Sequence, residues 1–97
     1  MLVLVTYDVE TQTSAGRRRL RRISKLCMDH GQRVQNSVFE CVVEPAQWVE
    51  MRKRLSEEID PERDSLRFYR LGKNWQGRLE HFGAKPSYDP EDDVLLV

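Results

Sequence analysis

The feature that most constrains the fold is the spacing of hydrophobic residues. From the start of the sequence to Leu71, segments with the spacing of a strand alternate with segments that have the spacing of a helix. Leu2–Tyr7 is apolar on both faces, which suits a central strand covered on both sides. Leu20, Ile23 and Cys27 then share one stripe at helical spacing, which predicts an amphipathic helix. The expected strands are Leu2–Tyr7, Arg33–Gln35, Ser37–Val43 and Leu66–Leu71, and the expected helices run from about Ser14 to His30 and from Pro45 to just before Pro61.

The order of these elements is compatible with few folds. Strand, helix, two strands, helix and strand form the βαββαβ order of the ferredoxin-like fold, an α+β plan with two helices on one face of an antiparallel sheet. The boundaries agree, since Ser14 suits an N-cap, Gly31 suits a helix stop and Pro45 suits the first turn of the second helix. No repeat and no second domain is recognisable, so residues 1–97 are expected to form one domain.

The size of the chain and the distribution of its charges limit the classes of function to consider. Ninety-seven residues bury a limited apolar surface, which favours self-association as a further source of stability. Sixteen basic residues balance sixteen acidic ones, so net charge alone gives no support for a nucleic-acid partner. The basic residues nevertheless concentrate in Arg17–Lys25, and an acidic cluster occupies Asp89–Asp93. The distribution of charge is therefore more informative than its sum.

The cysteines and the apolar segments indicate the compartment. Cys27 and Cys41 lie too far apart for a CxxC pair and His30 is a lone neighbour, so neither a zinc site nor a disulfide is expected. Both cysteines are expected to be reduced thiols in a cytoplasmic protein. No apolar segment approaches the ~20 residues of a membrane span, and no basic region precedes the first apolar run, which disfavours membrane insertion and secretion.

The end of the sequence has a different pattern. After Gly72 an irregular, polar stretch leads to Val94–Val97, a short apolar terminus. Such a segment is poorly placed to join its own core, so residues from about 73 to 97 are expected to be an arm that adds a fifth strand to a partner's sheet. This predicts a homodimer linked by strand exchange. The alternative is a frayed tail.

The basic residues of Arg17–Lys25 lie near the start of the predicted first helix, where positive charge is least favourable. Arg18, Arg21 and Arg22 project outward on the predicted helix, and Arg17 flanks its apolar stripe. Most of this charge falls in the first two turns, where the helix dipole disfavours each cation by ~0.3–1 kcal/mol. A nearby anion would reverse that preference, because backbone N–H groups at a helix start and arginine side chains both bind phosphate oxygens. The arrangement favours phosphate binding, and the alternative is a solvated basic face paired with acidic loops.

Asp8 ends the first predicted strand. An aspartate in this position is, on its own, most often a turn former. Mg²⁺ prefers oxygen ligands and usually takes one or two carboxylates, and the only other acidic residue close by in sequence is Glu10. In a two-fold dimer, one Asp8 from each chain could face the other across the axis and form a two-carboxylate site.

Four motifs in order give the sequence a family resemblance over its whole length. They are the strand ending in "TYDV", the helix "GRRRLRRISKLCMDHG", the segment "RVQNSVFEC" and the strand "FYRLG". Together they resemble the small CRISPR-associated endonuclease that partners the integrase in spacer acquisition. The tail "GRLEHFGAKPS" is similar to that of the subtype found with type I-C systems.

The resemblance implies a ferredoxin-like homodimer with C-terminal strand exchange and a site between the protomers. It implies that Asp8 is the catalytic carboxylate and the ligand of Mg²⁺ or Mn²⁺. It also implies nucleic-acid contacts from the arginines of the first helix and from Arg33. Tyr7, Ser37 and Phe39 lie in the matching motifs and are expected to shape the same cleft, although Phe39 also suits the core and Ser37 a hairpin.

Two functions from different classes follow. In the first, a metal at Asp8 activates water and cleaves phosphodiester bonds of RNA or duplex DNA, an endonuclease activity that the resemblance supports. In the second, the dimer is a non-catalytic bridge between integrase subunits that contacts duplex DNA through its arginines. One carboxylate per chain and the lack of a second metal site favour the bridge as the essential role. A third interpretation, a ferredoxin-like regulator that binds a small ligand, has no pocket motif to support it.

Overall fold

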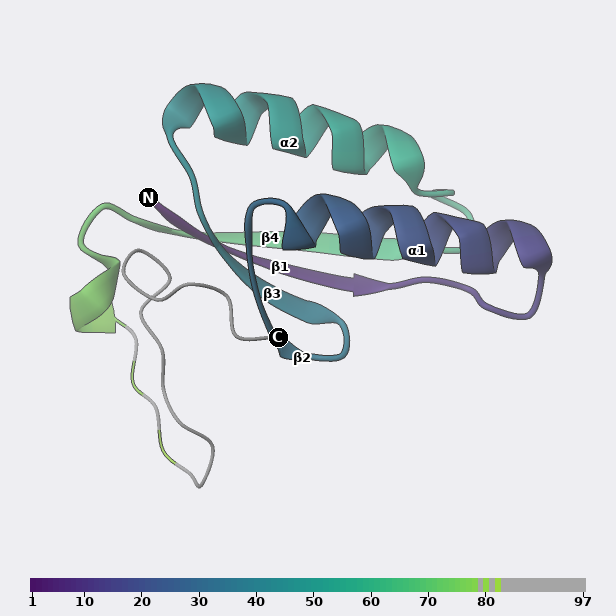
Figure 1. Cartoon of the computed structure of the whole chain (residues 1–97), viewed down its shortest axis with the longest axis horizontal. Helices are drawn as coiled ribbons and strands as arrows, with labels where there is room; N and C mark the ends of the chain where they lie inside the picture. Colours follow the sequence, from purple (N-terminus) through teal and green to yellow (C-terminus); the bar gives the residue numbers. More distant parts are fainter. Residues whose placement is uncertain (79, 81, 83–97) are drawn as a thin grey trace.

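The computed structural model describes residues 1–78, 80 and 82 of the chain. It contains four strands, two long helices and a 3₁₀ turn (Figure 1). In chain order the elements are β1 (Leu2–Asp8), α1 (Ser14–Met28), β2 (Gly31–Gln35), β3 (Val38–Val42), α2 (Pro45–Glu58), β4 (Ser65–Gly72) and the 3₁₀ helix η1 (Trp75–Arg78). The first residues of the predicted arm thus form η1 and bury Trp75, while the predicted strand Val94–Val97 lies outside the described residues.

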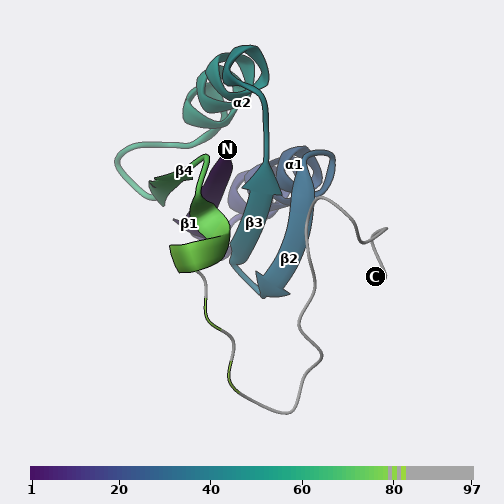
Figure 2. The same ribbon diagram turned by 90° about the vertical axis from the view of Figure 1, so that its left-hand side faces the viewer.

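The four strands form one antiparallel sheet in the order β2-β3-β1-β4. Figure 2, which views the molecule from the side of η1, shows α1 and α2 on the same side of this sheet. The element order and the sheet order confirm the prediction of a ferredoxin-like βαββαβ fold. Asp8 consequently ends a central strand, with β3 on one side of β1 and β4 on the other.

One face of the sheet supplies the core. Val3, Val5 and Tyr7 point from β1 toward the helices and are buried. The other core residues are Val9, Ile23, Leu26, Cys27, Phe39, Cys41, Val43, Trp48, Met51 and Leu55. On the opposite face, Leu4 and Thr6 are only half-buried. The expectation that β1 is covered on both faces is therefore met only in part, because both helices pack on the same face.

Cys27 and Cys41 lie in this core as free thiols. Burial raises the pKa of the Cys27 thiol to about 12 and also raises the pKa of Cys41. The Cys41 thiol donates a weak hydrogen bond of 3.8 Å to the carbonyl of Cys27. Buried thiols of this kind are inert, so neither is a candidate nucleophile.

The ends of α1 differ by a few residues from the prediction. Thr13 rather than Ser14 is the N-cap, because its Oγ1 accepts a hydrogen bond from the N–H of Gly16 at 3.0 Å. The helix ends at Met28, and β2 begins directly afterwards at Gly31. A Cβ at Gly31 would lie 2.2 Å from a backbone oxygen of β3, so the close pairing of β2 with β3 requires glycine there.

The second helix begins at Pro45, as predicted. A capping box between Glu44 and Gln47 precedes its first turn, with the Glu44 N–H donating to the Gln47 side chain at 2.8 Å. Trp48, Met51 and Leu55 form its buried face. Neither α1 nor α2 is long and apolar enough to cross a membrane.

Candidate functional site

Asp8 is the last residue of β1 and is exposed. Its register partner is Ser65, the first residue of β4. Because side chains alternate along a strand, Asp8 belongs with Leu4 and Thr6 to the sheet face that carries neither helix. Its carboxylate forms no hydrogen bond or ion pair with another described residue. An uncommitted carboxylate thus lies at the end of a central strand.

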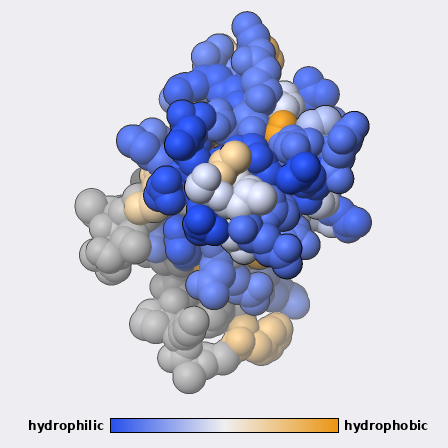
Figure 3. All heavy atoms as spheres, turned by 90° about the vertical axis from the view of Figure 1, so that its right-hand side faces the viewer, coloured by the Kyte–Doolittle hydropathy of each residue, from blue (hydrophilic) through white to orange (hydrophobic). Residues whose placement is uncertain are grey.

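The surface around the end of β1 is polar. Figure 1 shows that β1 ends on the side of the molecule where α1 begins and where α2 leads into β4. Figure 3 views the molecule from this side, and hydrophilic side chains dominate it. A charged ligand such as a phosphodiester would therefore meet little apolar surface at this end of the sheet.

Tyr7, the neighbour of Asp8, points into the core. Its hydroxyl lies 2.9 Å from the Ser24 Oγ of α1 and donates to the Asn36 carbonyl at 3.4 Å. Burial is the main cause that raises the pKa of Tyr7. Its ring stacks with that of Phe39, with 6.3 Å between the ring centroids. Tyr7 and Phe39 support the end of β1 from the core side, and the prediction that they shape a cleft stays a prediction.

Arg33 and Ser37 lie next to this aromatic pair. The guanidinium carbon of Arg33 on β2 is 5.2 Å from the centroid of the Phe39 ring, a cation–π contact. Ser37 lies in the turn between β2 and β3, and its carbonyl accepts a hydrogen bond from the Tyr7 N–H at 3.1 Å. Arg33 is exposed, so its guanidinium remains accessible to a second partner. The fold thus brings four of the predicted site residues into one group.

The four arginines of α1 that were predicted to bind nucleic acid are exposed but differ in their contacts. Arg17 donates from Nη1 to a backbone carbonyl in the loop before α1 at 3.0 Å, and Arg22 forms a 3.2 Å ion pair with Glu58 of α2. The side chains of Arg18 and Arg21 form no hydrogen bond or ion pair with any other residue in the described part of the chain. Two guanidinium groups are thus uncommitted, and two already have a protein partner.

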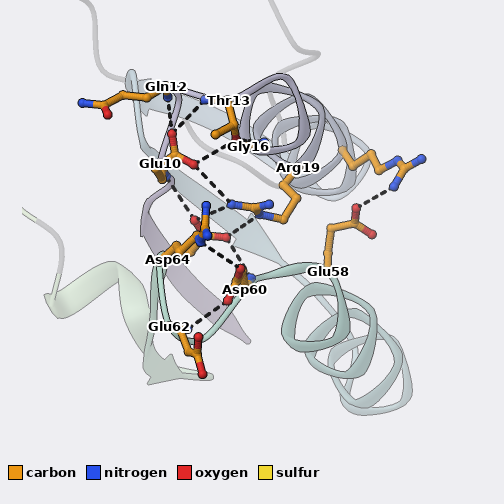
Figure 4. Close-up of polar contacts among 11 residues, drawn as sticks. Glu10, Gln12, Thr13, Gly16, Arg19, Glu58, Asp60, Glu62 and Asp64 are labelled. Carbon is orange, nitrogen blue, oxygen red and sulfur yellow. Dashed lines mark hydrogen bonds and ion pairs between the residues drawn. The ribbon is translucent and has the colours of Figure 1, made fainter.

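A fifth arginine of α1, Arg19, is held inside the molecule (Figure 4). Its Nε donates to Asp64 Oδ2 at 2.7 Å, and its Nη2 donates to Asp64 Oδ1 at 3.2 Å. The Asp64 side chain has no exposed surface and also accepts hydrogen bonds from the N–H groups of Glu10 at 3.0 Å and Asp60 at 2.8 Å. The bond from Arg19 lowers the pKa of Asp64 to about 2. No local sequence pattern marks this pair, because its members are 45 residues apart.

Glu10 is turned toward the start of α1. Its carboxylate accepts hydrogen bonds from the N–H groups of Gln12 and Thr13, the second at 2.9 Å, and from the Thr13 hydroxyl at 3.0 Å. The Arg19 Nη2 lies 3.9 Å from its Oε2. These contacts hold the carboxylate of Glu10 against the start of α1.

Asp8 by itself offers one carboxylate to a cation. Its exposed carboxylate offers oxygen ligands, which suit Mg²⁺ or Mn²⁺. Among residues 1–78, 80 and 82, no group of three or more histidine, cysteine, aspartate or glutamate side chains could hold a metal ion. The remaining ligands would therefore come from water, from the phosphates of a bound nucleic acid or from a second copy of the chain.

The chain is similar to known proteins over its whole length. The family model described as CRISPR associated protein Cas2 matches residues 1–79. A relative from Chlorobaculum tepidum named "CRISPR-associated endoribonuclease Cas2" is 67% identical over 96 residues, which cover 99% of this chain and 100% of the relative. A relative from Halalkalibacterium halodurans named "CRISPR-associated endonuclease Cas2" is 54% identical over 96 residues, which cover 99% of this chain and 100% of the relative.

The fold agrees with a solved structure from the same group of proteins. The crystal structure of Streptococcus pyogenes Cas2 at pH 6.5 matches with a TM-score of 0.72 and 64% sequence identity. The match covers 86% of this chain and 100% of that one. On its motifs, its sheet order and these similarities, the chain belongs to the CRISPR-associated protein Cas2 family.

Proposed function

We propose that this chain is a metal-dependent endonuclease that hydrolyses phosphodiester bonds of RNA or duplex DNA and takes part in CRISPR spacer acquisition. The names of the C. tepidum and H. halodurans relatives, an endoribonuclease and an endonuclease, support the activity. The observation that carries the proposal is the exposed Asp8 carboxylate, uncommitted among the described residues, at the polar end of the sheet where α1 begins.

In this function Asp8 holds Mg²⁺ or Mn²⁺, and the arginines hold the substrate. A metal held by Asp8 would act as a Lewis acid toward the phosphodiester and would make a bound water a better nucleophile. Arg18 and Arg21 lie three positions apart on one helix face, so both can contact phosphates of the same strand. Phosphate contacts position a backbone without reading its sequence, so cleavage with little sequence preference is expected.

We also propose that the active form is a homodimer. Leu4 and Thr6 are half-buried on the sheet face that carries neither helix, and Tyr69, the register partner of Leu4, is 45% exposed on the same face. A second copy would cover this face. A two-fold axis through it would bring one Asp8 from each chain to a common site, where the pair supplies two carboxylates.

Strand exchange is the second part of the dimer proposal. β4 is an edge of the described sheet, and the groove beside it is lined by Trp48, Val49, Arg52, Phe68 and Arg70. The sequence before Val94–Val97 is acidic, which complements the two arginines of this groove. Deleting residues 90–97 is expected to lower the dimer fraction in sedimentation experiments. A truncated chain that sediments as the full-length dimer does would overturn strand exchange.

The second candidate function is a bridge between integrase subunits that binds duplex DNA and does no chemistry. One observation favours it, because the described residues hold no cluster of metal-ligating side chains. In a bridge the arginines of α1 are required and Asp8 is not. Spacer acquisition in cells would then fail when Arg18 and Arg21 are replaced by alanine and would persist in Asp8→Asn.

The nuclease proposal is tested with purified protein on labelled RNA and labelled duplex DNA, in Mg²⁺ or in EDTA. Asp8→Asn keeps the shape of the side chain and removes the charge that a metal requires, so cleavage is expected to fall by about a hundredfold or more. Asp29→Asn is the matched control, because Asp29 is exposed and pairs with Lys25 at the C-terminal end of α1. Cleavage that survives Asp8→Asn or EDTA would overturn the proposal.

The subtype and the compartment are further parts of this proposal. The type I-C subtype rests on the tail sequence "GRLEHFGAKPS", and the genes that flank the coding sequence would test it. A cytoplasmic location rests on the two buried free thiols, which suit a reducing environment.

A further inference from the structure

The densest polar contacts near Asp8 involve a carboxylate that the nuclease chemistry does not use. Asp64 immediately precedes β4, whose first residue is the register partner of Asp8. The buried Asp64 carboxylate accepts four hydrogen bonds, two from Arg19 and one each from the N–H groups of Glu10 and Asp60. Figure 4 shows these donors converging on Asp64 from different segments of the chain.

These bonds join the three segments around the end of β1. The bond from the Glu10 N–H fastens the chain two residues after Asp8. The two bonds from Arg19 fasten α1, and the bond from the Asp60 N–H fastens the loop between α2 and β4. One buried side chain therefore fixes the chain after Asp8 to both of its structural neighbours.

The same rigidity extends to the first turn of α1. The Glu10 carboxylate binds the backbone and hydroxyl of Thr13, which in turn caps the N–H of Gly16. A Cβ at position 16 would lie 1.9 Å from the Glu10 carbonyl oxygen, so α1 packs directly against the connecting backbone. This packing fixes the position of Arg18, two residues further along α1, relative to β1.

Stability alone does not account for such an ion pair. Burying charges costs solvation, and apolar side chains of similar size often stabilise a fold at least as well. Charge-assisted bonds with two donors do, however, define one geometry. Catalysis at a phosphodiester requires the reacting groups to be held within about 0.5 Å of the productive arrangement. A side chain pair with one defined geometry meets this requirement.

We propose that Asp64 and Arg19 are positioning residues of the nuclease site. They hold the connection between β1 and α1 so that Asp8 and the uncommitted arginines of α1 act on the same phosphodiester. Asp64 does not touch the substrate, because its side chain has no exposed surface, and Arg19 acts through Asp64, to which its guanidinium is bound. The inference rests on the proposed nuclease function.

The test measures kcat, KM for RNA and the Mg²⁺ concentration for half-maximal cleavage, at a temperature where circular dichroism shows each variant folded. Asp64→Asn keeps the size of the side chain and removes the charge that faces Arg19. We expect kcat to fall about tenfold or more and the Mg²⁺ requirement to rise, while KM changes less than about twofold. Asp29→Asn is the matched control, because it breaks the exposed Lys25–Asp29 pair at the other end of α1 and should leave all three quantities unchanged.

A second variant separates positioning from stability. Arg19→Lys keeps the positive charge opposite Asp64 but loses the two-bond geometry, so kcat should fall while the melting temperature falls less than in Asp64→Asn. It also serves as the test if Asp64→Asn does not fold. Wild-type kcat in either folded variant would overturn the positioning role and leave the nuclease intact. Wild-type protein without Mg²⁺-dependent cleavage, or unimpaired Asp8→Asn, would overturn the nuclease function and the positioning role together.

Discussion

Asp8 ends β1 and Asp64 immediately precedes the neighbouring strand β4, so the two carboxylates lie at the same end of the sheet, but in opposite environments. Asp8 is exposed and has no hydrogen-bond partner among the described residues, whereas the Asp64 side chain is fully buried and accepts four hydrogen bonds. A carboxylate whose lone pairs are filled by the protein has none left for a metal, and an unfilled one does. The comparison teaches that the local supply of donors, rather than residue type or strand position, separates a structural carboxylate from a candidate catalytic one.

The largest expected difference between the two aspartates is in stability. Asp64→Ala leaves Arg19 and the N–H groups of Glu10 and Asp60 without their acceptor, so the free energy of unfolding should fall by about 2 kcal/mol or more. Asp8→Ala removes no interaction with a described residue and should change it by less than about 0.5 kcal/mol. Urea unfolding of the two variants measures both values. Equal losses would mean that Asp8 also has a structural partner, and the contrast between the two aspartates would disappear.

Acid should reveal the same contrast through Asp64. Its pKa is lowered from 3.8 to about 2, so the unfolded chain takes up this proton at a higher pH than the folded chain does. The stabilisation from ionised Asp64, about 2 kcal/mol, is complete above about pH 4 and is lost as the pH falls through 2. Unfolding free energies between pH 2 and pH 5 should therefore fall more steeply for wild type than for Asp64→Asn. Identical slopes would contradict the ion pair with Arg19.

The arginines of α1 show the same contrast between side chains with and without a protein partner. Replacing Arg18 and Arg21 by alanine should weaken binding to all duplexes about equally, and it should reduce the salt slope of the affinity by about one unit for each arginine that binds a phosphate. Arg19→Ala should lower stability and leave that slope unchanged, because its guanidinium binds Asp64. Fluorescence anisotropy at several salt concentrations measures the slopes. An unchanged slope in the double alanine variant would assign the two arginines to a solvated face.

The smallest effect is expected at the ion pair between α1 and α2. Arg22 and Glu58 are 3.2 Å apart, but the Arg22 side chain is 60% exposed. Water and salt screen such pairs, so Glu58→Gln should lower the unfolding free energy by less than about 1 kcal/mol. Thermal or urea unfolding checks this value. A loss as large as that of Asp64→Ala would show that exposure does not distinguish the two ion pairs.

Local pattern was enough to predict the elements, and tertiary contacts account for the small errors in their ends. Ser14 and Thr13 are both suitable N-caps, and only the bond from the Gly16 N–H distinguishes them. β2 starts at Gly31 rather than Arg33 because Gly31 pairs with Cys41 of β3, a contact that no local spacing contains. Element existence was therefore predictable from the sequence, and element ends were set partly by the assembled sheet.

The site was predictable to a smaller extent. Asp8 could be singled out as a candidate because it ends a strongly patterned strand and lies in a family motif, and its role stays a prediction. The spacing of the arginines predicted an exposed face, but it did not show that Arg19 turns inward or that Arg22 has a partner. Asp64 was missed because its donors come from positions that only the fold brings together.

The contacts of Asp64 with Glu10 and Arg19 close separations of 54 and 45 residues. Closing long loops costs more chain entropy than forming the α1 turns or the β2–β3 hairpin, so these bonds are expected to form after the folding transition state. A substitution at Asp64 would then speed unfolding in stopped-flow experiments and leave the folding rate nearly unchanged. The contacts that hold the chain after Asp8 in place would thus assemble late in folding and come apart early in unfolding.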